Sequence, residues 1–145
     1  MFKLISIDPG KCKCGLVLVD LNKKKVDQAI VLKTEALPKY VKKLISVEKI
    51  SKVIIGNGTT SEQNIEKLEF INEDLIIVEE KNTTFRAKKR YFELFPIRGF
   101  EILLPKEIFI INKNLDAISA LIILEDYFNE KFALSEDLDI KTWLK

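Results

Sequence analysis

Short apolar runs dominate the first third of the chain and are separated by charged or turn-forming residues. Three such runs cover residues 2–8, 15–20 and 26–32, and the segments between them are short and polar or contain Pro-Gly. Apolar runs of this length, joined by short turns, are typical of adjacent antiparallel strands. The pattern therefore predicts a three-stranded antiparallel meander at the start of the chain.

The middle of the chain combines helical periodicity with wholly apolar runs. Leu37, Val41, Leu44 and Ile45 form one stripe at helical spacing, next to a proline that suits a first helical turn. Two runs without polar residues, Val53–Ile55 before a glycine and Leu75–Val78, resemble strands that are covered on both faces of a parallel sheet. Further helices are predicted over residues 61–72, 83–94 and 115–129.

The resulting element order is β-β-β-α-β-α-β-α-α, which predicts an α/β fold. We expect a mixed five-stranded sheet, with a three-strand antiparallel meander plus two parallel strands, flanked by about four helices because right-handed crossovers place helices on both faces. This is the order of the ribonuclease H-like fold. The 145 residues suffice for one domain with a core. We assign residues 1–130 to that domain and 131–145 to a C-terminal tail of unpredicted packing.

Composition restricts the class of protein further. Hydrophobic residues make up 47% of the chain and charged residues 32%, which is typical of a folded globular protein. Uncharged apolar runs are too short to span a bilayer, and the first residues lead directly into a strand without a signal-peptide pattern. We expect a cytoplasmic protein with no membrane contact.

Histidine is absent from the chain, which excludes Ser-His and Cys-His catalysis. The two cysteines, Cys12 and Cys14, are too close in sequence for a good disulfide and too few for a zinc site with about four ligands. An enzyme built from this sequence must use carboxylates, lysines, hydroxyls and a metal.

Acidic residues stand at the ends of the predicted strands and at the start of the last helix. Asp8 ends the first strand, Glu79 and Glu80 follow the fifth, and Asp116 opens the last helix. Each has an ordinary explanation, such as a turn cap or a solvated strand end. If the first, fourth and fifth strands are parallel, however, the first three acids lie at one edge of the sheet, and the helix start can bring Asp116 to them. Hard carboxylate oxygens gathered there suit Mg²⁺ or Mn²⁺.

Basic residues concentrate in one segment. Between Lys81 and Arg98 six basic residues face a single acid, for a local net charge of +5 in a chain whose net charge is +2. Arg86, Lys89 and Arg90 lie on the predicted third helix, where they form either a solvated face, with Phe85 and other apolar residues turned inward, or a contact to backbone phosphates.

Four segments resemble the YqgF/RuvX family of ribonuclease H-like proteins, described as Holliday-junction resolvases and as nucleases that process pre-16S ribosomal RNA. These segments are Ile7–Leu16 with its Asp-x-Gly turn, the Gly-rich loop Ile55–Thr59, Val78–Ala87 with Glu-Glu-Lys-Asn-Thr-Thr, and Leu115–Leu124 with Asp-Ala. They occur in the family's order and span nearly the whole chain.

The resemblance implies specific roles. Asp8, Glu80 and Asp116 would be the catalytic metal ligands, for Mg²⁺ or Mn²⁺. Lys13, Lys81 and Thr83 or Thr84 would lie at the phosphate, and we expect Lys11 beside Lys13 to matter as well. The chain departs from the family where Glu79-Glu80 replaces Asp-Glu, where Lys81 replaces an arginine, and in the Gly-rich loop. These changes keep a possible metal site and leave the substrate open.

Three functions follow as hypotheses. The first is a metal-dependent endonuclease acting on Holliday-junction DNA or precursor rRNA, as a monomer or, for a junction, as a homodimer with two related active sites. The second is a non-catalytic nucleic-acid- or ribosome-associated module with the same fold. The third, an actin- or sugar-kinase-like phosphotransferase, shares the strand-Asp-x-Gly-strand opening but needs two such domains, for which the chain is too short.

Overall fold

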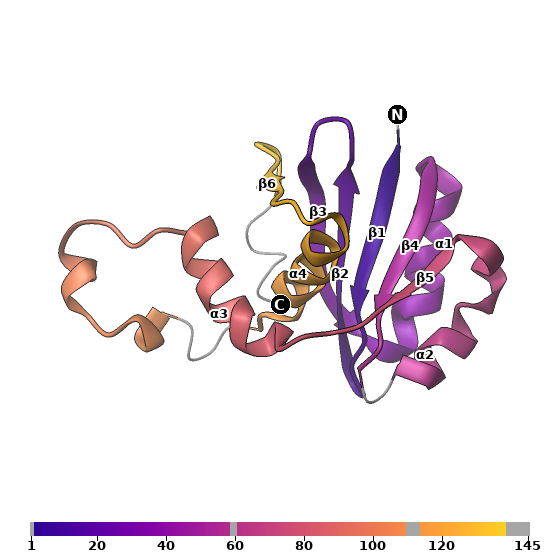
Figure 1. The fold of residues 1–145 in the computed structure, drawn as a ribbon, viewed down its shortest axis with the longest axis horizontal. Coiled ribbons are helices and arrows are strands. Elements are labelled where there is room, and N and C mark those ends of the chain that lie inside the picture. Colours follow the sequence, from indigo (N-terminus) through magenta and orange to yellow (C-terminus); the bar gives the residue numbers. More distant parts are fainter. Residues whose placement is uncertain (1, 59–60, 110–113, 139–145) are drawn as a thin grey trace.

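The structure is a computed structural model that describes residues 2–58, 61–109 and 114–138. The described residues form a six-stranded sheet in the order β5-β4-β1-β2-β3-β6 (Figure 1). The strands are β1 (Lys3–Asp8), β2 (Lys13–Asp20), β3 (Lys25–Lys33), β4 (Ile50–Gly56), β5 (Leu75–Val78) and β6 (Ala133–Leu134).

Strand directions confirm the predicted mixed sheet. β1 and β2 pair antiparallel, as do β2 and β3, so the first three strands form the meander. β4 pairs parallel to β1, and β5 pairs parallel to β4. The carboxyl ends of β1, β4 and β5 therefore lie at one edge of the sheet, which is the edge that the acidic residues were predicted to share.

The described residues contain four α-helices: α1 (Leu37–Val47), α2 (Ser61–Lys67), α3 (Thr83–Leu94) and α4 (Asp116–Phe128). Shorter 3-10 helices cover Thr34–Ala36, Glu69–Asp74, Gly99–Leu103 and Lys106–Phe109. The predicted helix over 61–72 was wrong in its second half, because the α-helix ends at Lys67 and the chain continues in a 3-10 helix.

The sheet is buried between two hydrophobic cores. On one face, α1 contributes Leu37, Val41 and Leu44 to a core with alternate residues of the central strands. On the other face, nearly every residue of α4 from Ala117 to Glu125 is buried, because the sheet covers one side of the helix and α3 packs on another. A buried serine of β1 fixes this arrangement, since the Ser6 hydroxyl donates a hydrogen bond of 2.7 Å to the Ala120 carbonyl.

The sixth strand corrects the predicted count of five. Its residues, Ala133 and Leu134, lie in the segment assigned to the tail and pair parallel to Lys25 and Val26 of β3. A two-residue strand has no readable alternation, so its sequence carried no strand signal. The remaining tail residues, 139–145, lie outside the described residues, and the assignment of separate ranges 1–130 and 131–145 stays a prediction.

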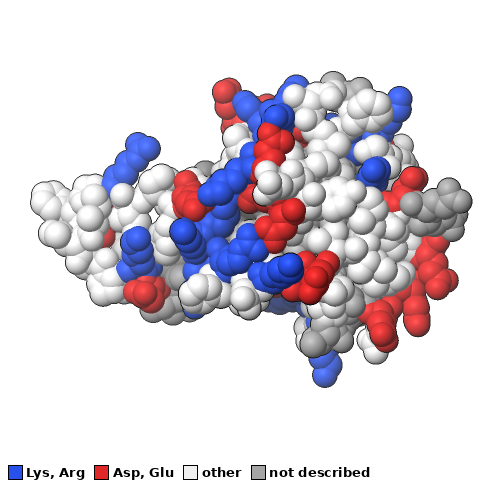
Figure 2. Space-filling view, in the orientation of Figure 1, with Lys and Arg blue, Asp and Glu red and all other residues white. Residues whose placement is uncertain are grey.

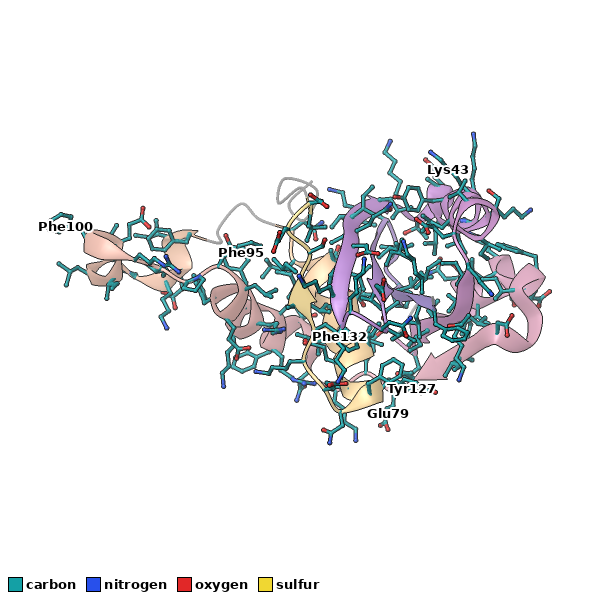
Figure 3. The ribbon with its side chains drawn as sticks, turned by 90° about the horizontal axis from the view of Figure 1, so that it is seen from above. Lys43, Glu79, Phe95, Phe100, Tyr127 and Phe132 are labelled. Carbon is teal, nitrogen blue, oxygen red and sulfur yellow. The ribbon has the colours of Figure 1, made fainter. Side chains whose placement is uncertain are left out.

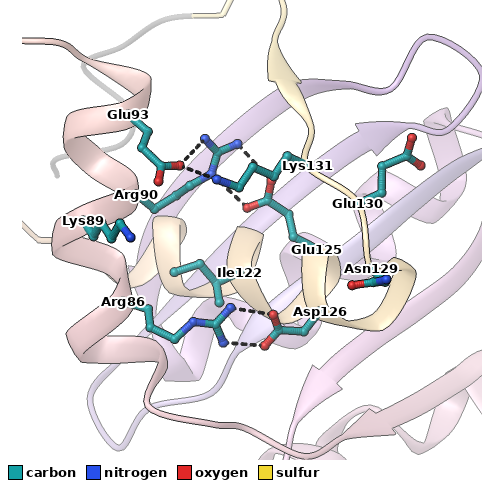
Figure 4. Close-up of a pocket in the computed structure, with 10 residues that line it drawn as sticks. All are labelled: Arg86, Lys89, Arg90, Glu93, Ile122, Glu125, Asp126, Asn129, Glu130 and Lys131. Carbon is teal, nitrogen blue, oxygen red and sulfur yellow. Dashed lines mark hydrogen bonds and ion pairs between the residues drawn. The ribbon is translucent and has the colours of Figure 1, made fainter.

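Helix α3 is attached to α4 by ion pairs. The Arg86 guanidinium donates two hydrogen bonds of 2.6 Å to the Asp126 carboxylate, and Arg90 donates two of 2.9 Å to Glu125 (Figure 4). Glu125 is only 7% exposed and also accepts a hydrogen bond from the Phe132 amide. These contacts link α3, α4 and the segment before β6. No helix in the described parts of the chain has the length and apolar character needed to cross a membrane.

Candidate functional site

The site begins with Asp8, the last residue of β1. Its register partner on β2 is Gly15, and the preceding residue Ile7 lies beside Ile55 of the parallel strand β4. Residues 4–7 of β1 are buried, and Asp8 follows them at the end of the strand, at the edge of the sheet. It is partly buried rather than solvated.

A glycine brings the start of α4 onto this edge. A side chain at Gly15 would place its Cβ 1.9 Å from the Asp116 carbonyl oxygen and 2.6 Å from the Ala117 amide nitrogen. The first turn of α4 therefore lies directly on the backbone of Gly15, the residue paired with Asp8. The Asn114 side chain accepts a hydrogen bond of 2.9 Å from the Asp116 amide and so fixes the start of the helix.

Glu80 reaches the same edge from the end of β5. A Cβ at Gly56, the last residue of β4, would lie 2.0 Å from the Glu80 carboxylate, so the missing side chain leaves the space that this carboxylate occupies. Two hydrogen bonds hold the segment: the Glu80 amide donates to the Asn57 side chain at 2.9 Å, and the Gly58 amide donates to the Glu80 carboxylate at 3.3 Å. Glu79 is exposed.

The three carboxylates have raised pKa values. Burial, followed by the negative charges of Glu80 and Asp116, raises the pKa of Asp8 to about 8. Burial also raises the pKa of Glu80, although the Gly58 hydrogen bond lowers it in part. Burial likewise raises the pKa of Asp116, although the Asn114 hydrogen bond and the charge of Lys13 lower it in part. Among the described residues, none of these three carboxylates forms an ion pair with a lysine or an arginine.

The donor set fits a hard divalent cation in chemistry, because three carboxylates supply the oxygen ligands that Mg²⁺ and Mn²⁺ prefer. Burial, followed by the charges of nearby carboxylates with no cation between them, accounts for the raised pKa of Asp8. Within the described residues, however, no three acidic or cysteine side chains are arranged to hold one metal ion. The Glu80 carboxylate is bonded to Gly58 instead.

A cleft of about 630 Å³ adjoins Glu80. It extends from Asn57 and Gly58 to the first turns of α3, where it is lined by Asn82, Thr83, Thr84, Phe85 and Lys88. Asn82 precedes α3 in a left-handed conformation, with φ of 52°, and its own side chain makes no capping hydrogen bond. The amides of the first turn and the positive end of the helix dipole face this region, which suits an anionic ligand.

The predicted phosphate-binding residues divide into two groups. Thr83 is buried and Thr84 exposed at the cleft beside Glu80, and Lys13 lies close enough to Asp116 to influence its pKa. Lys11 is exposed on the turn after Asp8, and Lys81 is exposed next to Glu80. Of these five residues, Thr83 and Thr84 share the cleft with Glu80 and Lys13 lies near Asp116, whereas Lys11 and Lys81 are near Asp8 and Glu80 in sequence.

The three basic residues predicted on α3 lie elsewhere. Arg86, Lys89 and Arg90 line a second cleft, of about 460 Å³, between α3 and the carboxyl-terminal half of α4 (Figure 4). Arg86 and Arg90 are bound to Asp126 and Glu125 there, so their charge is largely neutralised. Figure 2 shows the consequence, because blue and red side chains are interleaved over this region rather than forming a continuous basic surface. The structure does not bring these arginines to the carboxylates.

Sequence reasoning missed several residues around Glu80. Lys88 lines the cleft with Thr84, four residues earlier on the same helix, and this i, i+4 spacing was a signal that could have identified it. Phe85 also lines the cleft and is 79% exposed, contrary to the inward orientation considered for it. The roles of Asn57 and Asn114 depend on hydrogen bonds between loops, for which the sequence has no readable pattern.

The raised pKa values predict how stability depends on pH. Between the ordinary pKa of an aspartate and about 8, folded Asp8 keeps a proton that the unfolded chain has lost, so the free energy of unfolding of the metal-free protein falls as pH rises. Glu80 and Asp116 act in the same direction. We expect urea unfolding to show a loss of at least about 1 kcal/mol from pH 5 to pH 8, reversed by millimolar Mg²⁺ or Mn²⁺.

Two comparisons check this expectation. Asp20 and Glu93 have lowered pKa values, and their contribution to stability is lost only as pH falls below their ordinary range, so they do not affect the interval from pH 5 to pH 8. Asp8→Asn should lose less stability over that interval than the wild type. Equal losses in the two proteins would contradict the assignment.

The sheet order and the position of the helices define a ribonuclease H-like fold. Similarity to a solved structure agrees: the chain matches "T. thermophilus RuvC in complex with Holliday junction substrate" with a TM-score of 0.50 and 12% sequence identity, over 89% of this chain and 96% of that chain. A second Thermus thermophilus RuvC structure matches with a TM-score of 0.45 and 10% identity, over 93% and 84% of the respective chains.

An Aquifex aeolicus Ppx/GppA phosphatase also matches, with a TM-score of 0.40 and 14% identity, over 68% of this chain and 43% of that one. No protein-family model matches the sequence. No curated protein matches it either. The RuvC match with a TM-score of 0.50 and 12% identity supports the fold alone, and the chemistry has to be derived from the site.

Proposed function

We propose that this protein is a divalent-metal-dependent endonuclease that hydrolyses phosphodiester bonds in structured nucleic acid. The observation that supports the proposal most is the meeting of Asp8, Glu80 and Asp116 at one sheet edge, where burial, followed by the charges of the latter two, raises the pKa of Asp8. Partly buried carboxylates that lie close together without a cation are costly. A bound Mg²⁺ or Mn²⁺ would remove that cost.

The residues of the chain would divide the work as follows. Asp8, Glu80 and Asp116 would hold the metal, after the Glu80 carboxylate leaves the Gly58 amide. When bound, such ions activate water and stabilise the leaving oxygen in phosphodiester hydrolysis. The first turn of α3, with Thr83 and Thr84, would orient a phosphate in the adjoining cleft, since its amides and hydroxyls can donate hydrogen bonds.

Lysines would add charge around the same phosphate. Lys13 and Lys81 flank the carboxylates, Lys11 lies on the turn after Asp8, and Lys88 lines the cleft. Arg86, Lys89 and Arg90 remain candidates for contact with more distant phosphates, although the ion pairs of the two arginines reduce what they can contribute. Backbone contacts of this kind bind without reading sequence.

The substrate classes that we propose are branched DNA and structured RNA. The RuvC similarity, with its Holliday-junction complex, favours the first. The resemblance of the four sequence segments to the YqgF/RuvX family supports both, since that family is described in junction resolution and in pre-16S rRNA processing. We place the activity in the cytoplasm, as the sequence predicts.

A non-catalytic binding module is the second candidate. It is favoured by the arrangement of the acidic side chains, because no three of those described are placed to hold one ion. In that case nucleic-acid binding would be sensitive to salt but indifferent to Mg²⁺ and to substitution of Asp8.

Two adjacent glutamates provide a matched test between the candidates. Glu80→Gln removes a proposed ligand, whereas Glu79→Gln changes the exposed neighbour in the same way. With Mg²⁺ and labelled four-way junction, hairpin RNA and linear controls, we expect Glu80→Gln to lower the cleavage rate by about 10²- to 10³-fold and Glu79→Gln by less than about threefold. Equal rates for the two variants, or no cleavage of any substrate by the wild type, would sink the nuclease proposal.

A further inference from the structure

Residues 96–109 form an arm that projects away from the rest of the protein. The arm leaves the end of α3 and contains the two 3-10 helices Gly99–Leu103 and Lys106–Phe109. Figures 1 and 3 show it extending beyond α3, with Phe100 near its tip. Neither helix contains a buried residue, and no residue of the arm contributes to the two hydrophobic cores of the described chain.

The arm is nevertheless rich in large apolar side chains. Five of them are about half exposed or more: Phe100 at 92%, Ile102 at 66%, Leu103 at 84%, Leu104 at 48% and Ile108 at 53%. In Figure 2 the corresponding end of the molecule is mostly white. Single exposed apolar residues are ordinary, but five within nine positions concentrate apolar surface on one projecting segment.

The size of this surface is suited to a protein interface. The five side chains together expose on the order of 600 Å² of apolar area, at the upper limit of the largest patch on a typical monomer. A specific interface of ordinary size buries about 800 Å² per partner, and weak interfaces bury less. The arm alone therefore supplies most of the area that a weak dimer needs.

The charges on the arm favour a second copy of the same chain over nucleic acid. Arg98 and Lys106 are balanced by Glu101 and Glu107, so residues 96–109 have no net charge. A nucleic-acid contact would require an excess of cations. Around a two-fold axis, by contrast, a surface with equal numbers of cations and anions can place each cation of one copy near an anion of the other.

We propose that the arm is a homodimer contact, in which residues 96–109 of two copies pack against each other about a two-fold axis. The apolar side chains form the centre of the contact and the four charged residues its rim. The inference does not depend on the nuclease proposal, because it concerns a segment outside the carboxylate site. A dimer would carry two such sites related by symmetry.

The first test is the oligomeric state. Sedimentation equilibrium of the full chain from about 1 to 300 μM should show reversible dimerisation, with a Kd in the micromolar range expected for an interface at the low end of size. Leu103→Glu and Phe100→Ser should each weaken the dimer at least about tenfold. Val47→Glu, which changes a side chain 68% exposed on α1, should leave the Kd unchanged. Circular dichroism confirms that each variant is folded.

A charge-exchange experiment tests the symmetry directly. One variant, Arg98→Glu with Lys106→Glu, makes the arm uniformly acidic, and another, Glu101→Lys with Glu107→Lys, makes it uniformly basic. Each should be monomeric alone because like charges face one another, and an equimolar mixture should form heterodimers.

Three results would overturn the proposal: a wild type that stays monomeric throughout the range, a dimer that survives the arm substitutions, or a mixture of recharged variants that remains monomeric. If the wild type never dimerises and the Leu103→Glu variant loses binding to the junction or the hairpin, the arm would instead be assigned to nucleic-acid contact. Cleavage is not read in any of these experiments, so failure of the nuclease proposal leaves them interpretable.

Discussion

Asp8→Asn is expected to abolish metal-dependent cleavage and, at the same time, to stabilise the metal-free protein. Asparagine has nearly the same shape as aspartate, but it carries no charge and coordinates a divalent cation more weakly than a carboxylate does. If the carboxylate contributes about 4 kcal/mol to the rate through the ion, cleavage falls by about 10³-fold. Stability should rise at pH 8, because the substitution removes a partly buried charge that faces Glu80 and Asp116.

The opposite signs of the two effects make this test specific. Substitution of a residue that only supports the fold would lower both activity and stability of the protein. Substitution of a functional residue that is held at the expense of stability would lower activity and raise stability. Asp116→Asn should behave in the same way, and Asp137→Asn, which changes an exposed acid far along the chain, should alter neither quantity. Retained cleavage in Asp8→Asn, or a lower melting temperature without metal, would contradict the account.

Glu125→Ala is expected to cause the largest loss of stability among the acidic residues outside the site. Its side chain is nearly buried, pairs with Arg90 through two hydrogen bonds of 2.9 Å and accepts another from the Phe132 amide. Removing one partner of a buried pair leaves the other charge uncompensated, at a cost of about 3 kcal/mol. Glu93 stays near Arg90 at 3.2 Å and keeps the loss from being greater.

A surface pair provides the control for that measurement. Glu130 pairs with Lys24 on the same part of the molecule, but both side chains are substantially exposed. Glu130→Ala should therefore cost less than about 1 kcal/mol. The two variants are compared by urea unfolding at pH 7. A cost below about 1 kcal/mol for Glu125→Ala would mean that α3 is held mainly by its apolar contacts and that Arg90 is free to bind a ligand.

Much of the sheet could be predicted from the sequence because each strand has its own signal. The wholly apolar runs before Gly56 and at Leu75–Val78 indicated parallel strands, and the short turns around residues 9–14 and 21–25 indicated the meander. That order alone places the ends of β1 and β5, with Asp8 and Glu80, at one edge, whereas the approach of Asp116 depends on the contact of α4 with Gly15. β6 could not, since two residues that pair with β3 have no periodicity.

The arrangement of side chains was less predictable than the strands. Arg86 and Arg90 read as a basic helix face because their acidic partners lie 35 to 40 residues away in sequence, at Glu125 and Asp126. The contact of Glu80 with Gly58 depends on the path of the loop after β4. The exposed arm lies between the predicted helices 83–94 and 115–129, and sequence patterns do not show whether apolar residues in such a segment turn inward.

Anomalous diffraction from crystals soaked in Mn²⁺ shows directly whether the three carboxylates hold a metal ion. We expect a manganese peak within bonding distance of Asp8, Glu80 and Asp116, with the Glu80 side chain turned away from the Gly58 amide, and no such peak in Asp8→Asn crystals treated identically. A wild-type crystal without manganese at this edge of the sheet, under conditions in which the ion is bound elsewhere, would contradict the proposed metal site.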